Sequence, residues 1–241
     1  MGKQRRQADP VFSTHRAFYK EIPRTADVML VENVPEYGTE VARDHLPKHW
    51  DFRSVTIDPR HLGVPAGRTR IWILAWDTKR VQWREGGISI EEVMHILGAR
   101  AVGKAGDFFW RKLPAAVLTH AQARNLSDYE KLKGWVQYPD LTQYCANERG
   151  RGELQDGSLQ TLTTNSSLIY SKAHKRFLSA QEMVATHILP TCSEHARKCK
   201  APIVELEHMP ESHACRMAGN TMSVPCVAAL LLTAIINLKL V

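Results

Sequence analysis

The first part of this 241-residue sequence contains almost no glycine, and cysteine is sparse throughout. Gly2 is the only glycine before Gly38, and the first of the five cysteines is Cys145. The shortage of glycine excludes a loop that would cradle a phosphate near the N-terminus, so nothing supports a plain nucleotide-binding α/β domain. An odd number of scattered cysteines does not make a disulfide framework and is typical of a reducing compartment.

Long apolar runs are also scarce. The N-terminus is basic and polar and lacks the apolar core of a secretory signal, so we expect a protein that is not secreted. The one candidate membrane span, 224–241, is at the short limit for crossing a bilayer and contains Pro225, Asn237 and Lys239. We interpret it as a buried C-terminal helix and expect no membrane partner.

The sequence is basic. It has 32 Lys and Arg against 25 Asp and Glu, a net charge of +7, and the excess is concentrated in 1–24 and 79–133. A basic surface attracts polyanions such as nucleic acid, but a solvated face would have the same composition. Charge alone therefore leaves both interpretations open.

Helical spacing of apolar residues occurs in several places. It predicts helices over 11–26, 36–50 and 174–188. In the last of these, Ser179 and Glu182 have the spacing of a capping box, which marks a helix start. The sequence ends with a polar Gly-Asn turn that leads into an apolar helix.

Apolar runs predict strands at 28–32, 51–57 and 71–76, and the alternation of helices with strands predicts an α/β fold. We expect the first of them to be a buried parallel strand. Glu32 and Asn33 follow its apolar residues at once, so its carboxyl end would deliver polar groups into a crevice. The periodicity breaks up over 79–158, which we interpret as a separate small lobe.

Five segments carry a family resemblance when they are taken in order. Singly, each has an ordinary explanation, such as a surface arginine pair at Arg68 and Arg70. Together they resemble the later motifs of the DNA (cytosine-5) methyltransferases. The segments are VENVPEY, GVPAGRTRIWILAWD, LQTLTT, RFLSAQEMVATHILP and AGNTMSVPCVAALLLTAI.

The resemblance implies methyl transfer from S-adenosylmethionine to C5 of cytosine in DNA. It implies part of a Rossmann-like methyltransferase sheet, formed by its later strands only, with a small target-recognition lobe. The predicted parts are 1–78 and 159–241 for the catalytic α/β domain and 79–158 for the lobe.

The same resemblance suggests roles for individual residues. A carboxyl group at a strand end can activate a cytosine ring through N3, and two arginines nearby can support the base or a phosphate. The base must leave the helix stack to reach them. The candidates are Glu32, Arg68 and Arg70 for catalysis, Asn33, Asn220, Thr221 and Met222 for the cofactor, and Thr161, Thr163 and Arg176 for DNA contact and lobe placement.

The sequence departs from the family pattern at three motif positions. Ala66 stands where the family has Gln, Ser179 replaces Thr, and Met222 replaces a common Val. The first change removes an amide near the expected active-site loop. The second keeps a hydroxyl that can cap a helix.

Two family features that precede Glu-Asn-Val do not occur in the sequence. These are the glycine-rich turn that binds S-adenosylmethionine and the Pro-Cys motif that carries the nucleophile. Residues 2–10 resemble the loop that follows this nucleophile. The pair Pro225–Cys226 begins an apolar helix, so we interpret Cys226 as a packed thiol.

We therefore expect no turnover from this chain by itself. Without the earlier strands, apolar surface should be exposed near Val28–Val31 and along Val227–Ile236. Three accounts remain: an incomplete fragment, which we favour, a split enzyme completed by a chain that supplies the N-terminal half, or a non-catalytic relative that binds DNA or regulates. A eukaryotic source would imply the nucleus, and any other source the cytoplasm.

Two further groups of residues are candidates for sites. The spacing of Cys192, His195, Cys199 and Cys215 fits no standard zinc pattern, so we predict no metal. The aromatic residues of the lobe could stack on bases, although core packing explains them as well. They are Trp110, Trp135, Tyr138 and Tyr144.

Overall fold

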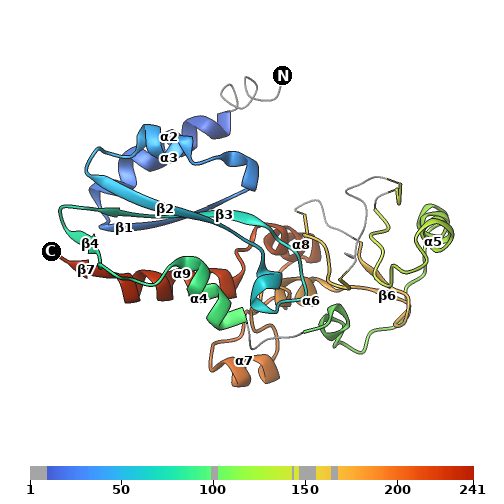
Figure 1. Cartoon of the computed structure of the whole chain (residues 1–241). Helices are drawn as coiled ribbons and strands as arrows, with labels where there is room; N and C mark the ends of the chain where they lie inside the picture. The colour runs from blue at the N-terminus through green and yellow to red at the C-terminus, as the bar shows by residue number, and fades with distance from the viewer. Residues whose placement is uncertain (1–9, 99–102, 143, 147–155, 164–167) are drawn as a thin grey trace. The chain divides into compact units, whose positions relative to one another are not determined.

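The computed structural model describes residues 10–98, 103–142, 144–146, 156–163 and 168–241 (Figure 1). The prediction about residues 2–10 falls almost wholly outside this part. The chain divides into two compact units. The first comprises Met1–Ile57, Thr69–Met94 and Ala228–Val241, and the second comprises Asp58–Arg68 and His95–Val227.

A three-stranded sheet forms the centre of the first unit. Its strands are β1 (Val28–Asn33), β2 (Trp50–Ile57) and β3 (Arg70–Asp77), in the order β1-β3-β2. β3 is buried along nearly its whole length, as its continuous apolar run requires of a central strand. The predicted strands at 51–57 and 71–76 are thus confirmed.

The first strand was predicted to be parallel to its neighbours, and this prediction is wrong for the pairing that the structure describes. β1 pairs with β3 in antiparallel register, and β2 also pairs with β3 in antiparallel register. β3 returns between the two other strands and separates them. A buried apolar run indicates a strand covered on both faces, but it does not fix the direction of the neighbouring strand.

Helices cover both faces of this sheet (Figure 1). α2 (Pro10–Glu21) and α3 (Glu40–His45) lie on one face, where Tyr19 and Val41 pack with Ile73 of β3. On the other face, Ala234 of α9 (Val224–Asn237) packs with Leu74 of β3. Successive side chains of a strand point to opposite faces, so one central strand supports both layers.

The C-terminus closes the first unit with a second, two-stranded sheet. β4 (Val81–Trp83) pairs in antiparallel register with β7 (Leu238–Leu240). The side-chain amide of Asn237 donates to the carbonyl oxygens of Ile88 and Thr233 at 2.9 and 2.8 Å. These bonds fix the end of α9 against the segment that precedes α4.

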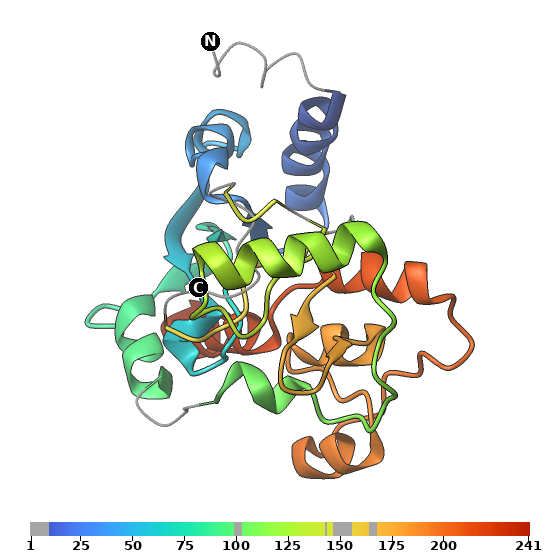
Figure 2. The ribbon, with the colours of Figure 1, turned by 90° about the vertical axis from the view of Figure 1, so that its right-hand side faces the viewer.

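The second unit contains the remaining helices and a short hairpin. Within it, α5 packs against the hairpin of β5 and β6 through Tyr129, Tyr170 and Phe177 (Figure 2). The elements are η3 (Pro59–Leu62), η4 (Ala105–Phe108), α5 (His120–Leu132), β5 (Tyr170–Ser171), β6 (Arg176–Phe177), α6 (Ala180–Ala185), α7 (Ser193–Cys199) and α8 (Glu211–Asn220). α4 (Ile90–Gly98) passes from the first unit to the second, and η1 (Ile22–Arg24) and η2 (Pro35–Tyr37) belong to the first.

Two helix predictions need correction in their extent, and one predicted turn is helical. The helix predicted over 36–50 is α3 alone, because Pro47 cannot continue a helix and Trp50 already belongs to β2. The helix predicted over 174–188 begins at Ala180, since Arg176–Phe177 is a strand. Its capping box at Ser179 is confirmed. The residues predicted as a Gly-Asn turn form the last residues of α8.

The predicted exposed apolar surface is confirmed on α9 and only in part on β1. Leu231, Leu232 and Ile235 are exposed, and Ile235 is 74% exposed. On β1, Val28 is exposed but Met29 and Val31 are buried. The difference arises because α2 and α3 cover the face of β1 on which those two side chains lie.

One apolar stretch among the described residues, Glu211–Asn237, is long and apolar enough to cross a membrane, and a third of an apolar 18-residue window within it is buried. It consists of α8 and α9, which Thr221–Ser223 separate. α9 has 14 residues. At a rise of 1.5 Å per residue it is about 21 Å long, which is less than the thickness of a bilayer core.

The two faces of α9 provide a matched test of this packing. Leu230 is 0% exposed and its neighbour Leu231 is 50% exposed. Leu230→Ala should lower the free energy of unfolding by about 2–5 kcal/mol, because it leaves a cavity. Leu231→Ala should change it by less than about 0.5 kcal/mol, and urea unfolding measures both. Equal losses for the two variants would contradict the packing.

Candidate functional site

Glu32 and Arg70 meet at one end of the sheet. In the antiparallel register, Glu32 lies opposite Trp72 and Asn33 lies opposite Ile71, so the end of β1 lies beside the start of β3. Oε1 of Glu32 is 2.9 Å from Nε of Arg70, and the two side chains are 13% and 16% exposed. The structure thus brings together the predicted carboxylate and one of the two predicted guanidinium groups.

This pair is chemically suited to hold a polar ring. Both charges are largely removed from water, so each depends on the other for compensation. A carboxylate has two oxygens, and pairing through Oε1 leaves capacity for a further hydrogen bond. The Arg70 guanidinium is fixed further by Nη1, which donates to the carbonyl oxygen of Thr69 at 2.7 Å.

Arg68 has a different partner. It is buried in the second unit, and its Nη2 donates to the carbonyl oxygen of Gly219 near the end of α8 at 3.1 Å. The chain passes from the second unit to the first between Arg68 and Thr69. Although the two arginines are two residues apart, Arg68 binds the backbone of α8 and Arg70 binds Glu32.

The turn that precedes Arg68 lies beside the segment that contains Thr161. The amide of Gly67 donates to the carbonyl oxygen of Leu159 at 2.6 Å, and the amide of Leu159 donates to the carbonyl oxygen of Pro65 at 2.9 Å. Thr161 is half-buried and Thr163 is exposed. Two motif segments that are far apart in the sequence are therefore neighbours, while their contact with DNA stays a prediction.

Ala66 suits its position in this turn. It is buried in the core cluster of the second unit, together with Leu159 and Leu162. The longer amide side chain usual in the family would need hydrogen-bond partners if it were buried here, and burying an amide without them is costly. The departure from the family pattern is therefore consistent with the local packing.

The residues predicted to bind the cofactor do not by themselves fit S-adenosylmethionine. Oδ1 of Asn33 accepts the amide of Val34 at 2.8 Å, and the hydroxyl of Thr221 donates to the carbonyl oxygen of Met217 at 2.7 Å. Asn220 and Met222 are exposed. Local backbone contacts thus occupy two of the four candidates, and the sequence has no glycine-rich turn beside them, so their role stays a prediction.

Arg176 and Glu182 form a buried pair that holds another segment. Their side chains are 3% and 0% exposed, with Nη1 of Arg176 2.8 Å from Oε2 of Glu182. The backbone amide of Arg111 donates to Oε1 of Glu182 at 2.8 Å. The backbone carbonyl oxygen of Arg111 accepts from Nη2 of Arg176 at 2.7 Å. The pair therefore fixes the chain at Arg111, a role that the sequence did not reveal, and DNA contact by Arg176 stays a prediction.

The environment of Glu182 lowers its pKa. Burial alone would raise the pKa of this carboxyl group. Hydrogen bonds from the Arg176 side chain, and from the backbone amides of Ser179 and Arg111, lower it by more. The net pKa therefore lies below the ordinary value of a glutamate.

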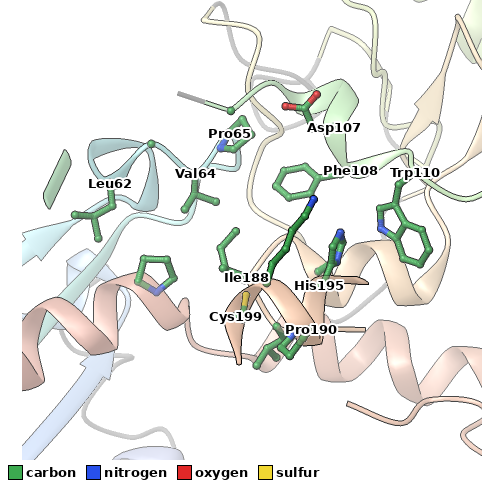
Figure 3. A pocket seen from close by; sticks show the side chains of 16 residues that line it. Leu62, Val64, Pro65, Asp107, Phe108, Trp110, Ile188, Pro190, His195 and Cys199 are labelled. Atoms are coloured by element: carbon green, nitrogen blue, oxygen red, sulfur yellow. The ribbon is translucent and has the colours of Figure 1, made fainter. Parts of the chain in front are cut away.

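The second unit also contains a cavity of about 480 Å³ (Figure 3). Its walls are mostly apolar and come from Leu62–Pro65, the segment around Phe108, and the region from Ala185 to Cys199. Trp110 and His195 lie edge to face on its wall, with ring centroids 5.4 Å apart. The sequence did not reveal this cavity, since its apolar residues follow the pattern of an ordinary core. None of the predicted site residues lines it.

Metal ligands are not grouped in the described part of the chain. No group of three or more His, Cys, Asp or Glu there could hold a metal ion.

Solved structures with a similar fold are methyltransferases. The Entamoeba histolytica methyltransferase EhMeth is 14% identical, with a TM-score of 0.54, over 97% of this chain and 71% of that chain. The S. pombe Dnmt2 methyltransferase is 15% identical, with a TM-score of 0.55, over 86% and 66%. An E. coli prophage protein described as a DNA modification methyltransferase is 15% identical, with a TM-score of 0.56, over 94% and 74%.

No protein-family model and no curated protein matches the sequence. The chain spans 66–74% of the length of the three structures named above. At these low identities the likeness concerns the fold. The predicted resemblance to methyltransferases is therefore confirmed as a shared fold, and the α/β class is confirmed with it.

The pair of Arg176 and Glu182 gives stability a defined pH dependence. A depressed carboxyl pKa contributes stability above the unfolded-state value of about 4.3, and this stability is lost as the pH falls through the lower folded-state value. Glu182→Gln should lower the free energy of unfolding by about 3–5 kcal/mol at pH 7, and by less below pH 4.

Glu194→Gln is the control, since an exposed pair such as Glu194–Lys198 contributes little to stability. Urea unfolding at pH 7 and below pH 4 measures all three proteins. A constant difference between the wild type and Glu182→Gln over this range would refute the assignment.

Proposed function

We propose that this chain is the base-recognising portion of a cytosine-specific DNA methyltransferase, whose reaction transfers a methyl group from S-adenosylmethionine to C5 of cytosine. The observation that carries the proposal is the ion pair of Glu32 with Arg70, at the carboxyl end of a strand in a methyltransferase-like fold. Carboxylate and guanidinium together can hydrogen-bond one edge of a planar base.

The chemistry of cytosine gives each of these groups a task. A thiolate adds to C6 only when the ring is made electrophilic, which requires a hydrogen bond or a proton at N3. The Glu32 carboxyl group would serve N3 and the exocyclic amine, and Arg70 would hold the carboxyl group in position. A base inside a duplex cannot reach such a site, so it must be flipped out.

Cys226 is not suited to supply the nucleophile. Covalent attack needs an accessible thiolate. Cys226 follows Pro225, yet it is 1% exposed at the start of α9. When bound, S-adenosylmethionine would supply the methyl group. The described residues of this chain do not build its site.

We infer that a further segment with the glycine-rich turn and the Pro-Cys motif completes the site, either in the same polypeptide or in a separate one. In the described part of the chain β1 pairs only with β3, so its other edge can accept another strand. The exposed apolar side chains of α9, Leu231, Leu232 and Ile235, would be covered by the same addition.

The proposal is tested in two stages. The genomic DNA upstream of the Met1 codon should encode the two motifs, in frame or in a neighbouring gene. The extended polypeptide, or the reconstituted pair, should then transfer labelled methyl groups to DNA, whereas the 241-residue chain should neither do so nor bind S-adenosylmethionine in calorimetry.

In the active form, Glu32→Gln should reduce the turnover number by about 100-fold or more, because it removes the group that activates the ring. Glu36→Gln, which changes an exposed glutamate nearby, should leave turnover unchanged. Absence of both motifs upstream, together with DNA binding by the chain, would favour a non-catalytic DNA-binding protein instead. Undiminished turnover in Glu32→Gln would overturn the mechanism.

A further inference from the structure

Three segments of the second unit that are far apart in the sequence lie side by side. They are 111–117, 131–137 and 171–175. The backbone amide of Ala116 donates to the carbonyl oxygen of Lys175 at 2.8 Å, and the backbone amide of Lys172 donates to the backbone carbonyl oxygen of Gln137 at 3.1 Å. A core cluster that includes Tyr129, Val136 and Tyr170 supports them. We refer to the three segments as the basic surface.

The basic surface has charge of one sign. Its segments contain no Asp and no Glu. Asp128 and Glu130 precede it on α5, so the positive charge begins at Lys131. The cationic residues are Arg111, Lys112, Lys131, Lys133, Lys172 and Lys175, with His174 beside them. Because no acidic residue within these segments compensates them, they form a surface complementary to a polyanion.

Trp135 projects from this surface. It is 46% exposed and lies in a turn in which the amide of Val136 donates to the carbonyl oxygen of Lys133 at 2.9 Å. Nζ of Lys172 is 3.5 Å from the carbonyl oxygen of Gly134, so an ammonium group lies next to the residue that precedes the indole. A single exposed aromatic residue is ordinary on a protein surface, but one among lysines combines stacking area with phosphate-binding charge.

The Lys133 side chain also fixes the turn that contains Trp135. Its ammonium group donates to the carbonyl oxygen of Cys145 and so ties this turn to the segment around Cys145. The turn is thus held at both sides by lysines. The backbone that carries the indole therefore loses little conformational freedom on binding, which favours the use of Trp135 as a platform.

We propose that the basic surface binds the phosphate backbone of DNA at a position where one nucleotide is unpaired, and that the base of this nucleotide stacks on Trp135. The choice of DNA rests on the proposed function, whereas the stacking and the charge do not. Every base has a π-face and only an unstacked base exposes it, so Trp135 should discriminate unpaired from paired DNA rather than one sequence from another.

Fluorescence anisotropy with the full 241-residue chain tests this inference, without cofactor. The probes are a fully paired duplex, the same duplex with one unpaired nucleotide, and the corresponding RNA. Trp135→Ala should weaken binding to the DNA with the unpaired nucleotide about tenfold and binding to the paired duplex less than twofold. Trp135→Phe, which keeps an aromatic ring, should retain most of the affinity.

Lys112→Gln, which changes an exposed lysine of the basic surface, should weaken both DNA probes alike and reduce the slope of log K against log salt by about one. Lys198→Gln, which changes an exposed lysine outside the basic surface, should leave binding unchanged. Equal effects of Trp135→Ala on the two DNA probes, no DNA binding at low salt, or tighter binding of the RNA would overturn the inference. Because methyl transfer is not measured, failure here is distinct from failure of the proposed enzymatic function.

Discussion

The return of β3 between β1 and β2 is the constraint on which the candidate site depends. Antiparallel pairing brings the last residues of β1 to the first residues of β3, and this places Glu32 within 2.9 Å of Arg70. A shift of one residue in this register would turn Arg70 to the opposite face of the sheet. The register itself is fixed by alternate apolar side chains, since Ile73 and Leu74 must face different helical layers.

The same sheet explains why the chain exposes apolar surface. β1 is buried where α2 and α3 cover it, but its outer edge has no partner among the described residues. On α9, the buried side packs on the sheet and the opposite side carries Leu231 and Ile235 in solvent. A surface of this kind normally marks an interface, and its position beside the sheet is suited to a further strand and helix layer. The fold and the proposed incompleteness of the active site therefore have a common cause.

The sequence predicted features that depend on local chemistry. The capping box at Ser179 marks the start of α6 correctly, and the apolar run of β3 predicts a central strand. It did not predict the direction of β1, since an apolar run is compatible with a parallel or an antiparallel neighbouring strand. The helix expected over 36–50 was too long because a few apolar positions fit a strand and a helix alike, and Pro47 decided between them.

Long-range contacts were also beyond sequence reasoning. The bonds between Arg111 and the pair of Arg176 and Glu182 join segments about 65 residues apart, and no local pattern signals them. The pairing of Glu32 with Arg70 was anticipated only through the family resemblance. The strand pattern pointed to Glu32 as a polar group at a strand end, but it did not indicate a partner, because alternate arginines are ordinary surface features.

A double-mutant cycle on Glu32 and Arg70 tests the central claim most directly. Glu32→Gln, Arg70→Met and the double variant are unfolded in urea and compared with the wild type. If the two side chains form the ion pair at the end of the sheet, their effects are not additive, and the coupling free energy is about 1 kcal/mol or more. Additivity within about 0.3 kcal/mol would show that the groups do not interact, and the proposed base-recognition site would have no foundation.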